Sequence, residues 1–122
     1  MSKPMIVTAT LLVTGLLIAA TVQAEEVEQV FGFYCAQCHG MEGKGDGPNV
    51  TADFPVDPRN FTNAEEMEKL SDADIKNVIL QGGPVASKSP MMPPWGKTLS
   101  EEQVDALVKH LRKLCNCEGK SG

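Results

Sequence analysis

The run Cys35-Ala36-Gln37-Cys38-His39 constrains what this chain can fold into more than any other feature of its 122 residues. Two thiols at this spacing can add across the two vinyl groups on one edge of a porphyrin, and an imidazole directly after the second thiol can reach the iron from one face. A redox dithiol, half of a zinc site and a structural disulfide are the alternative interpretations. The motif favours covalently bound haem c, which the fold must then enclose.

The first 24 residues have the pattern of a secretory signal peptide. Lys3 precedes an apolar stretch over about 5–20, and Val22-Gln23-Ala24 places small residues at −3 and −1. An uncleaved membrane anchor is the alternative, although the stretch is short for a membrane span and contains three threonines. We expect cleavage after Ala24, export to the periplasm, and no membrane insertion of the mature chain.

Removal of residues 1–24 leaves 98 residues, which we divide into one small domain over 25–114 and a C-terminal tail over 115–122. They contain only six aromatic side chains, so a buried porphyrin would supply apolar area that a small core lacks. They carry 10 basic and 16 acidic residues, a net charge of −6 once Lys3 is removed. This balance argues against nucleic acid or an anionic membrane surface as a partner.

Helical periodicity and capping signals predict an all-α fold, because no alternating strand pattern of any length is present. The intervening glycine- and proline-rich segments are interpreted as loops, with the one after His39 wrapping a bulky cofactor. The last helix has the clearest apolar stripe, formed by Val104, Leu107, Val108, Leu111 and Leu114. The predicted elements are a first helix over 25–34, a short helix over 63–70 capped by Asn63, a helix that starts at Ser71 with Asp74 and ends at Gly82-Gly83-Pro84, and a last helix capped by Ser100 and Gln103.

A second iron ligand opposite His39 would decide between electron transfer and ligand chemistry. Met41 lies too close to His39 to reach the other face, and Met67 lies on an amphipathic helix that favours a core role. Met92 directly precedes Pro93 and is therefore held in stiff, extended chain, as a ligand should be, with Met91 pointing the other way. Gap filling by flexible side chains is the alternative for this pair.

In the order of these motifs the chain resembles the class I cytochromes c, which are small, soluble, monohaem proteins. The resemblance covers nearly all of 25–114 and rests on Cys-x-x-Cys-His-Gly after a helix, Gly-Lys-Gly-Asp-Gly-Pro, Pro-Arg-Asn-Phe, and Met-Pro-Pro-Trp-Gly before a helix. It implies a cytochrome c fold with crosswise N- and C-terminal helices, and further short helices and loops wrapping one haem.

The resemblance also assigns roles to individual residues. It implies that a proline carbonyl orients the second nitrogen of His39, with Pro58 as first choice and Pro55 as second. The other implied roles are thioether bonds from Cys35 and Cys38, axial iron ligation by His39 and Met92, and a haem pocket that includes Pro58, Phe61 and Trp95.

Two features depart from this family. Where the terminal helices cross, the matching positions are Val27 and His110, and we interpret His110 as a packing residue, with haem ligation as the alternative. Cys115 and Cys117 could complete a four-thiolate zinc site with the motif cysteines, but one intervening residue is fewer than paired zinc cysteines usually have. In an oxidising compartment a local disulfide, or a bridge to another molecule, is favoured.

Ligation by His and Met fills both axial positions, which keeps substrate from the iron, and the thioether favours the reduced metal. We therefore expect an electron carrier rather than an enzyme, with redox partner proteins as donor and acceptor. A haem subunit of a periplasmic oxidoreductase complex is the first alternative, since the Cys115/Cys117 tail could tether a partner. A gas sensor or peroxidase with an open distal site is the second.

Overall fold

The computed structural model describes residues 23–24 and 26–121. These residues form helices and connecting loops without a β-strand, so the prediction of an all-α fold is confirmed. The predicted signal peptide lies outside the described residues except for 23–24. Within the described part of the chain, no helix is both long and apolar enough to cross a membrane.

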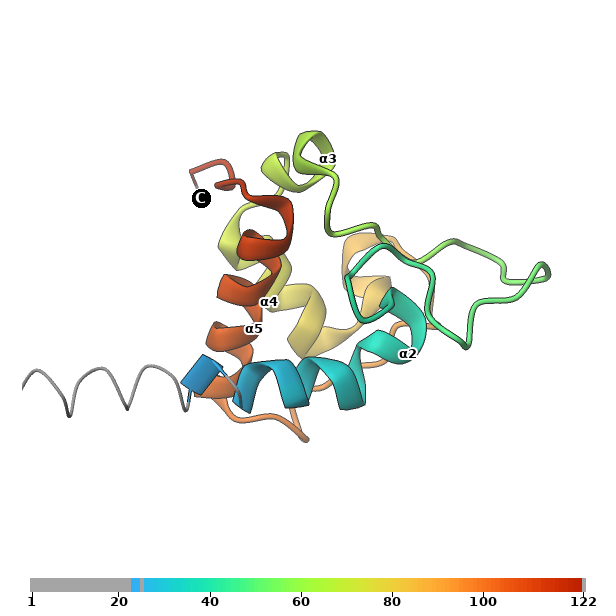
Figure 1. The fold of residues 1–122 in the computed structure, drawn as a ribbon, viewed down its shortest axis with the longest axis horizontal. Coiled ribbons are helices and arrows are strands. Elements are labelled where there is room, and N and C mark those ends of the chain that lie inside the picture. Colours follow the sequence, from blue (N-terminus) through green and yellow to red (C-terminus); the bar gives the residue numbers. More distant parts are fainter. Residues whose placement is uncertain (1–22, 25, 122) are drawn as a thin grey trace, which may run out of the picture.

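A helical segment over 26–34 leads through a single turn residue, Cys35, into the next helix. The chain over 40–61 then runs as irregular loop, and its green part extends away from the C-terminal helix in Figure 1. The remaining elements, in chain order, are α2 (Ala36–His39), α3 (Ala64–Glu68), α4 (Asp72–Gln81), the 3₁₀ helix η1 (Gly83–Ala86) and α5 (Glu101–Cys115).

Three helices begin at the caps that the sequence predicts. The Asn63 side chain accepts a hydrogen bond from the backbone at the start of α3, and α4 and α5 each begin with a complete capping box. These side chains pair backbone amides that a helix start leaves without an intrahelical partner. The α4 and α5 boxes are formed by Ser71 with Asp74 and by Ser100 with Gln103.

One short element differs from the sequence prediction, which has loop after the helix that ends at Gly82-Gly83-Pro84. A 3₁₀ turn forms at η1 because Pro84, near its start, has its φ preset for a helical turn and lacks only an N–H that would be unpaired there. Ser87 ends the turn with a left-handed backbone, φ 54°.

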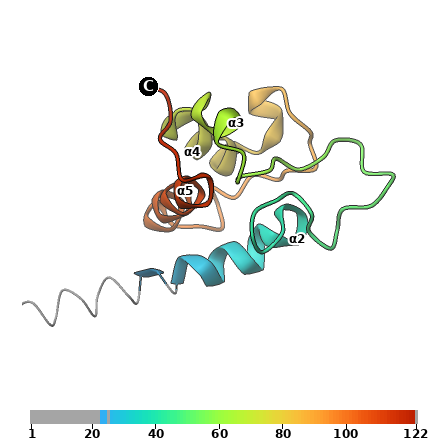
Figure 2. The ribbon, with the colours of Figure 1, turned by 45° about the horizontal axis from the view of Figure 1, so that its top comes forward.

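The core lies where α5 meets the other helices. On the predicted stripe of α5 the first four residues are buried and Leu114 is partly buried. The segment 26–34 crosses α5 (Figure 2), and there the buried Phe31 ring lies 4.8 Å from the His110 ring, centroid to centroid. The crosswise packing expected of the terminal helices is therefore present. Both α3 and α4 also pack on α5, through the buried side chains of Met67, Ile75 and Ile79.

Candidate cofactor site

A cavity of about 940 Å³ opens between the helices and the loops 54–61 and 83–95. This volume lies at the upper end of the range for small-molecule sites, roughly 300–1,000 Å³. Its wall is largely apolar and includes core side chains such as Phe31, Met67 and Leu107. The fold brings all seven residues predicted for the site to this one wall: Cys35, Cys38, His39, Pro58, Phe61, Met92 and Trp95.

The imidazole of His39 is oriented for metal binding. Its Nδ1 lies 3.1 Å from the carbonyl oxygen of Arg59, which can only accept, so Nδ1 carries the proton and Nε2 keeps a free lone pair. The Phe61 ring stacks on the imidazole with 4.3 Å between centroids. Burial is the main cause that lowers the pKa of His39 below its usual 6.5, although the Arg59 hydrogen bond opposes it. The neutral imidazole is the form that binds a metal.

The carbonyl that orients His39 belongs to Arg59, so the expectation of a proline carbonyl from Pro58 or Pro55 is wrong. The Pro58 carbonyl instead faces Gly45, where an added Cβ would lie 2.5 Å from the oxygen. Successive carbonyls of extended chain point to opposite sides, and the chain over 57–60 lies outside any helix. The Arg59 carbonyl therefore turns toward the histidine, and Pro58 is left to line the cavity.

The glycine-rich loop after His39 caps the C-terminal end of α2. The last carbonyls of a helix have no intrahelical partner, and amides of this loop supply partners for three of them. Of the loop residues 40–50, Asn49 lines the cavity, and the wrapping of the cofactor by this loop stays a prediction. The pairs are Gly45 to His39 at 2.7 Å, Gly47 to Cys38 at 3.1 Å and Asn49 to Gln37 at 2.8 Å.

Cys35 and Cys38 are free thiols on the cavity wall. Burial raises the pKa of the Cys35 thiol from 9.0 to about 11. A redox dithiol depends on a thiolate at neutral pH, so this environment disfavours the redox-dithiol interpretation of the motif.

The loop that contains Met92 is anchored to the end of α4. The Met92 carbonyl accepts from Gly83 at 2.9 Å, and the Trp95 amide donates to Ile79 at 2.9 Å. Met92 is half-buried, whereas Met91 is 52% exposed, yet both have atoms at the cavity wall. The sequence predicts that Met91 points away from the site, but the cavity lining does not separate the two residues in this way. They differ in burial instead.

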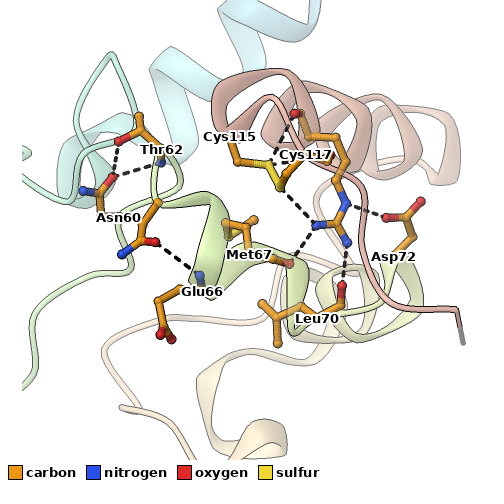
Figure 3. The surroundings of a disulfide bond; sticks show 10 residues. Asn60, Thr62, Glu66, Met67, Leu70, Asp72, Cys115 and Cys117 are labelled. Carbon is orange, nitrogen blue, oxygen red and sulfur yellow. Dashed lines mark hydrogen bonds and ion pairs between the residues drawn. A yellow bond between two sulfur atoms is a disulfide. The ribbon is translucent and has the colours of Figure 1, made fainter.

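Three residues considered as alternative ligands lie elsewhere. Cys115 and Cys117 form a disulfide with each other (Figure 3), which confirms the local pairing and removes the four-thiolate zinc site. In the described residues no group of three or more His, Cys, Asp or Glu side chains is arranged for a metal ion. His110 is not among the cavity-lining residues and contacts Phe31 at the helix crossing, so its interpretation as a packing residue is confirmed.

Sequence reasoning missed three parts of the site. Arg59 stands within Pro-Arg-Asn-Phe, but nothing in the sequence indicates which carbonyl of this segment faces His39. The apolar stripe of α5 predicts burial and does not reveal that Leu107 and Leu111 face a cavity rather than another helix. The helical spacing of Tyr34 was the available signal for a third contact, since its ring meets that of Trp95 at 5.2 Å between centroids.

An all-α fold around a cavity lined by two thiols, an imidazole with free Nε2 and a thioether defines a c-type cytochrome. Residues 22–111 match the model of the family described as cytochrome c oxidase, cbb3-type, subunit III. The chain belongs to this family.

Two solved structures are similar to it. The KustC0563 c-type cytochrome is 31% identical, with 71% of this chain and 94% of that chain covered and a TM-score of 0.55. A chain of the Kuenenia stuttgartiensis reducing HAO-like protein complex Kustc0457/Kustc0458 is 36% identical, with a TM-score of 0.59. That match covers 74% of this chain and 41% of the other, so this chain spans less than half of that one. No protein of curated function matches the sequence significantly.

Membership of this family implies covalently bound haem c with its iron, as the sequence predicts. The residues present fit that group. Two free thiols, an imidazole whose Nδ1 is already paired and a largely apolar cavity of about 940 Å³ are what a covalently attached porphyrin requires.

Proposed function

We propose that this chain is a periplasmic cytochrome that transfers single electrons through one haem c. Cys35 and Cys38 form the thioether bonds, and His39 and Met92 are the axial iron ligands. The observation that supports this proposal is the convergence of all four side chains, from two segments of the chain that are distant in sequence, on one cavity. When bound, the haem supplies a metal centre that exchanges one electron without a substrate at the iron.

The protein groups hold these ligands still. The Arg59 carbonyl fixes the proton of His39 on Nδ1, and the Phe61 ring fixes the plane of the imidazole. The loop after η1, which contains Met92, is anchored by backbone hydrogen bonds and restrains this second ligand. Ligands that need to move little between two oxidation states favour rapid electron exchange, whereas an open axial position would favour a sensor or a peroxidase.

Substitution of the two adjacent methionines tests the ligand assignment. Met92→Ala should abolish the weak near-infrared sulfur-to-iron band of the ferric protein and let the reduced protein bind carbon monoxide. Met91→Ala, the matched control, should retain the band and exclude carbon monoxide. The reverse pattern would exchange the roles of the two residues, and loss of the band in neither variant would reject both as ligands.

A haem-bearing subunit of a periplasmic oxidoreductase complex is the second candidate. The similar chain from the reducing HAO-like protein complex favours it, since that chain belongs to a multi-protein assembly. Size exclusion of native extract, followed by haem absorbance, distinguishes the two. A free carrier elutes near its own mass, and a subunit elutes with its partner. N-terminal sequencing of the haem-containing chain tests export, because cleavage after Ala24 predicts a start at Glu25.

A further inference from the structure

The disulfide between Cys115 and Cys117 lies outside the cavity wall and closes a very small loop. The two cysteines are separated by a single residue. In the chain-entropy account the stabilisation by a disulfide grows with the length of the loop that it closes. This disulfide therefore contributes little to global stability, and its effect is local to the end of α5.

That effect is to direct the chain from α5 back onto α3 and α4. Asn116 ends α5 with a left-handed backbone, φ 48°. The Lys120 amide then donates to the Glu68 carbonyl at 3.0 Å, and the Lys120 ammonium lies 3.5 Å from the Asp74 carboxylate. Residues 117–121 of the C-terminal tail lie on the α3 side of the molecule in Figure 1.

A fixed cation lies between the tail and the helices. Only 12% of the Arg112 side chain is exposed, and its guanidinium bonds to three groups around the start of α4 (Figure 3). Its Nη1 is also 4.0 Å from the Sγ of Cys117. A neighbouring guanidinium favours a thiolate on Cys117 when the disulfide is open. The three groups are the carbonyls of Met67 at 2.9 Å and Leu70 at 2.7 Å, and the carboxylate of Asp72 at 2.8 Å.

The two sulfur-bearing residues differ in access. Cys115 is buried, with 6% of its surface exposed, whereas Cys117 is half-buried. Cys117 also lines a second, surface pocket together with Arg112 and Glu118. An incoming thiolate therefore reaches Cys117 before Cys115.

We propose that Cys115 and Cys117 form a thiol–disulfide exchange site for a protein dithiol, and that its redox state determines whether the C-terminal tail stays on α3. A thiolate of the dithiol attacks the Sγ of Cys117, the bond to Cys115 breaks, and the Cys115 sulfur leaves with the electron pair and takes a proton from water. The second thiol of the partner then attacks the partner's first sulfur in the mixed disulfide. This step closes the partner's disulfide and releases Cys117 as a thiolate beside Arg112.

The partner supplies the electrons and protons that the exchange requires. The dithiol is oxidised to its disulfide by two electrons, and the cysteine pair of this chain is reduced by the same two. The partner loses two protons in all. Cys115 gains one proton, and the other passes to solvent. The release of the tail can reach the haem cavity through Met67 in α3 and through Leu70. Arg112 bonds to the carbonyls of both residues, and both also line that cavity.

Dithiothreitol tests the site in the folded holoprotein without denaturant. After treatment and alkylation with iodoacetamide, intact mass should show two added groups, with Cys117 modified before Cys115 when the reagent is limiting. Hydrogen exchange at the Lys120 amide should accelerate about tenfold, since its bond to Glu68 is lost. Resistance to dithiothreitol until the protein unfolds would overturn the proposal, as would a reduced pair with unchanged Lys120 exchange.

Three variants supply the controls. Cys115→Ser/Cys117→Ser should show the fast Lys120 exchange with and without dithiothreitol. Cys115→Ser should form a mixed disulfide with an aromatic disulfide reagent about tenfold faster than Cys117→Ser, because only Cys117 is accessible; equal rates would contradict the order of attack. Addition of four groups rather than two would show free thiols at Cys35 and Cys38, which rejects the thioether proposal and leaves the exchange readout intact.

Discussion

The two histidines of this chain each have a ring nitrogen without a hydrogen-bond partner, but the surroundings of the two nitrogens differ. His39 lines the cofactor cavity and has Nδ1 bonded to the Arg59 carbonyl, which leaves the lone pair of Nε2 available for a metal. His110 has a buried Nε2 with no hydrogen-bond partner among the described residues, beside the Phe31 ring. An unpaired buried polar atom is costly, so the helix crossing is not at its stability optimum.

Replacement of His110 should therefore stabilise the protein. His110→Phe removes the unpaired nitrogen and keeps a ring against Phe31, so the free energy of unfolding should rise by about 1 kcal/mol at neutral pH. His110→Gln keeps a polar group at the crossing and should give no gain. Chemical denaturation of the holoprotein measures both, and a gain with Gln equal to that with Phe would contradict the unpaired nitrogen as the cause.

The same substitution should change the dependence of stability on pH. Burial is the main cause that lowers the pKa of His110 below 6.5, with Lys113 adding to it and Glu28 opposing it. The unfolded chain then binds more protons than the folded one, so wild-type stability falls as the pH falls through 6.5. The advantage of His110→Phe should therefore grow from about pH 7 to about pH 5. His110→Gln should share the flatter profile, and parallel profiles for all three would count against titration of His110.

At the scale of elements, the sequence predicts helix starts and the residue types of the site better than it predicts loop geometry. Capping boxes and Asn63 are local signals, because a side chain pairs a backbone amide three residues away. The identity of the carbonyl opposite His39 depends on a contact between Gly45 and Pro58, which are distant in sequence. The role of the glycine-rich loop likewise depends on backbone hydrogen bonds that fold it back onto α2, which composition does not encode.

Gly45→Ala should disturb this pairing. Gly45 has φ +82° and its missing Cβ would lie 2.5 Å from the Pro58 carbonyl, so the loop and the segment with Pro58 must move apart. We expect a loss of at least about 2 kcal/mol in stability, by the cost of strained backbone and lost contacts. Gly32→Ala is the control, since its Cβ would meet only the Met41 side chain at 3.5 Å. That variant should be neutral or slightly stabilised, because alanine is the better helix former. Equal losses in thermal denaturation would contradict the loop argument.

At the scale of the whole molecule, the core and the cofactor cavity are one structure. Phe31, Met67 and Leu107 are buried side chains of the core and at the same time wall residues of the cavity. A domain of this size has a net stability of only about 5–15 kcal/mol, so a cavity of this volume would leave little margin without its cofactor. The haem is then part of the hydrophobic core as well as the functional group.

Removal of the attachment thiols tests this dependence. Cys35→Ser/Cys38→Ser should abolish covalent haem, and the chain should lose about 5 kcal/mol or more, enough to replace the cooperative thermal transition with a broad one. Cys115→Ser/Cys117→Ser removes the same number of cysteines from outside the cavity and should keep both the haem absorbance and a cooperative transition. Near-ultraviolet circular dichroism and calorimetry report the two outcomes. A sharp transition in the haem-free variant would show that the helices alone complete the core, and that the cofactor is held by a fold formed without it.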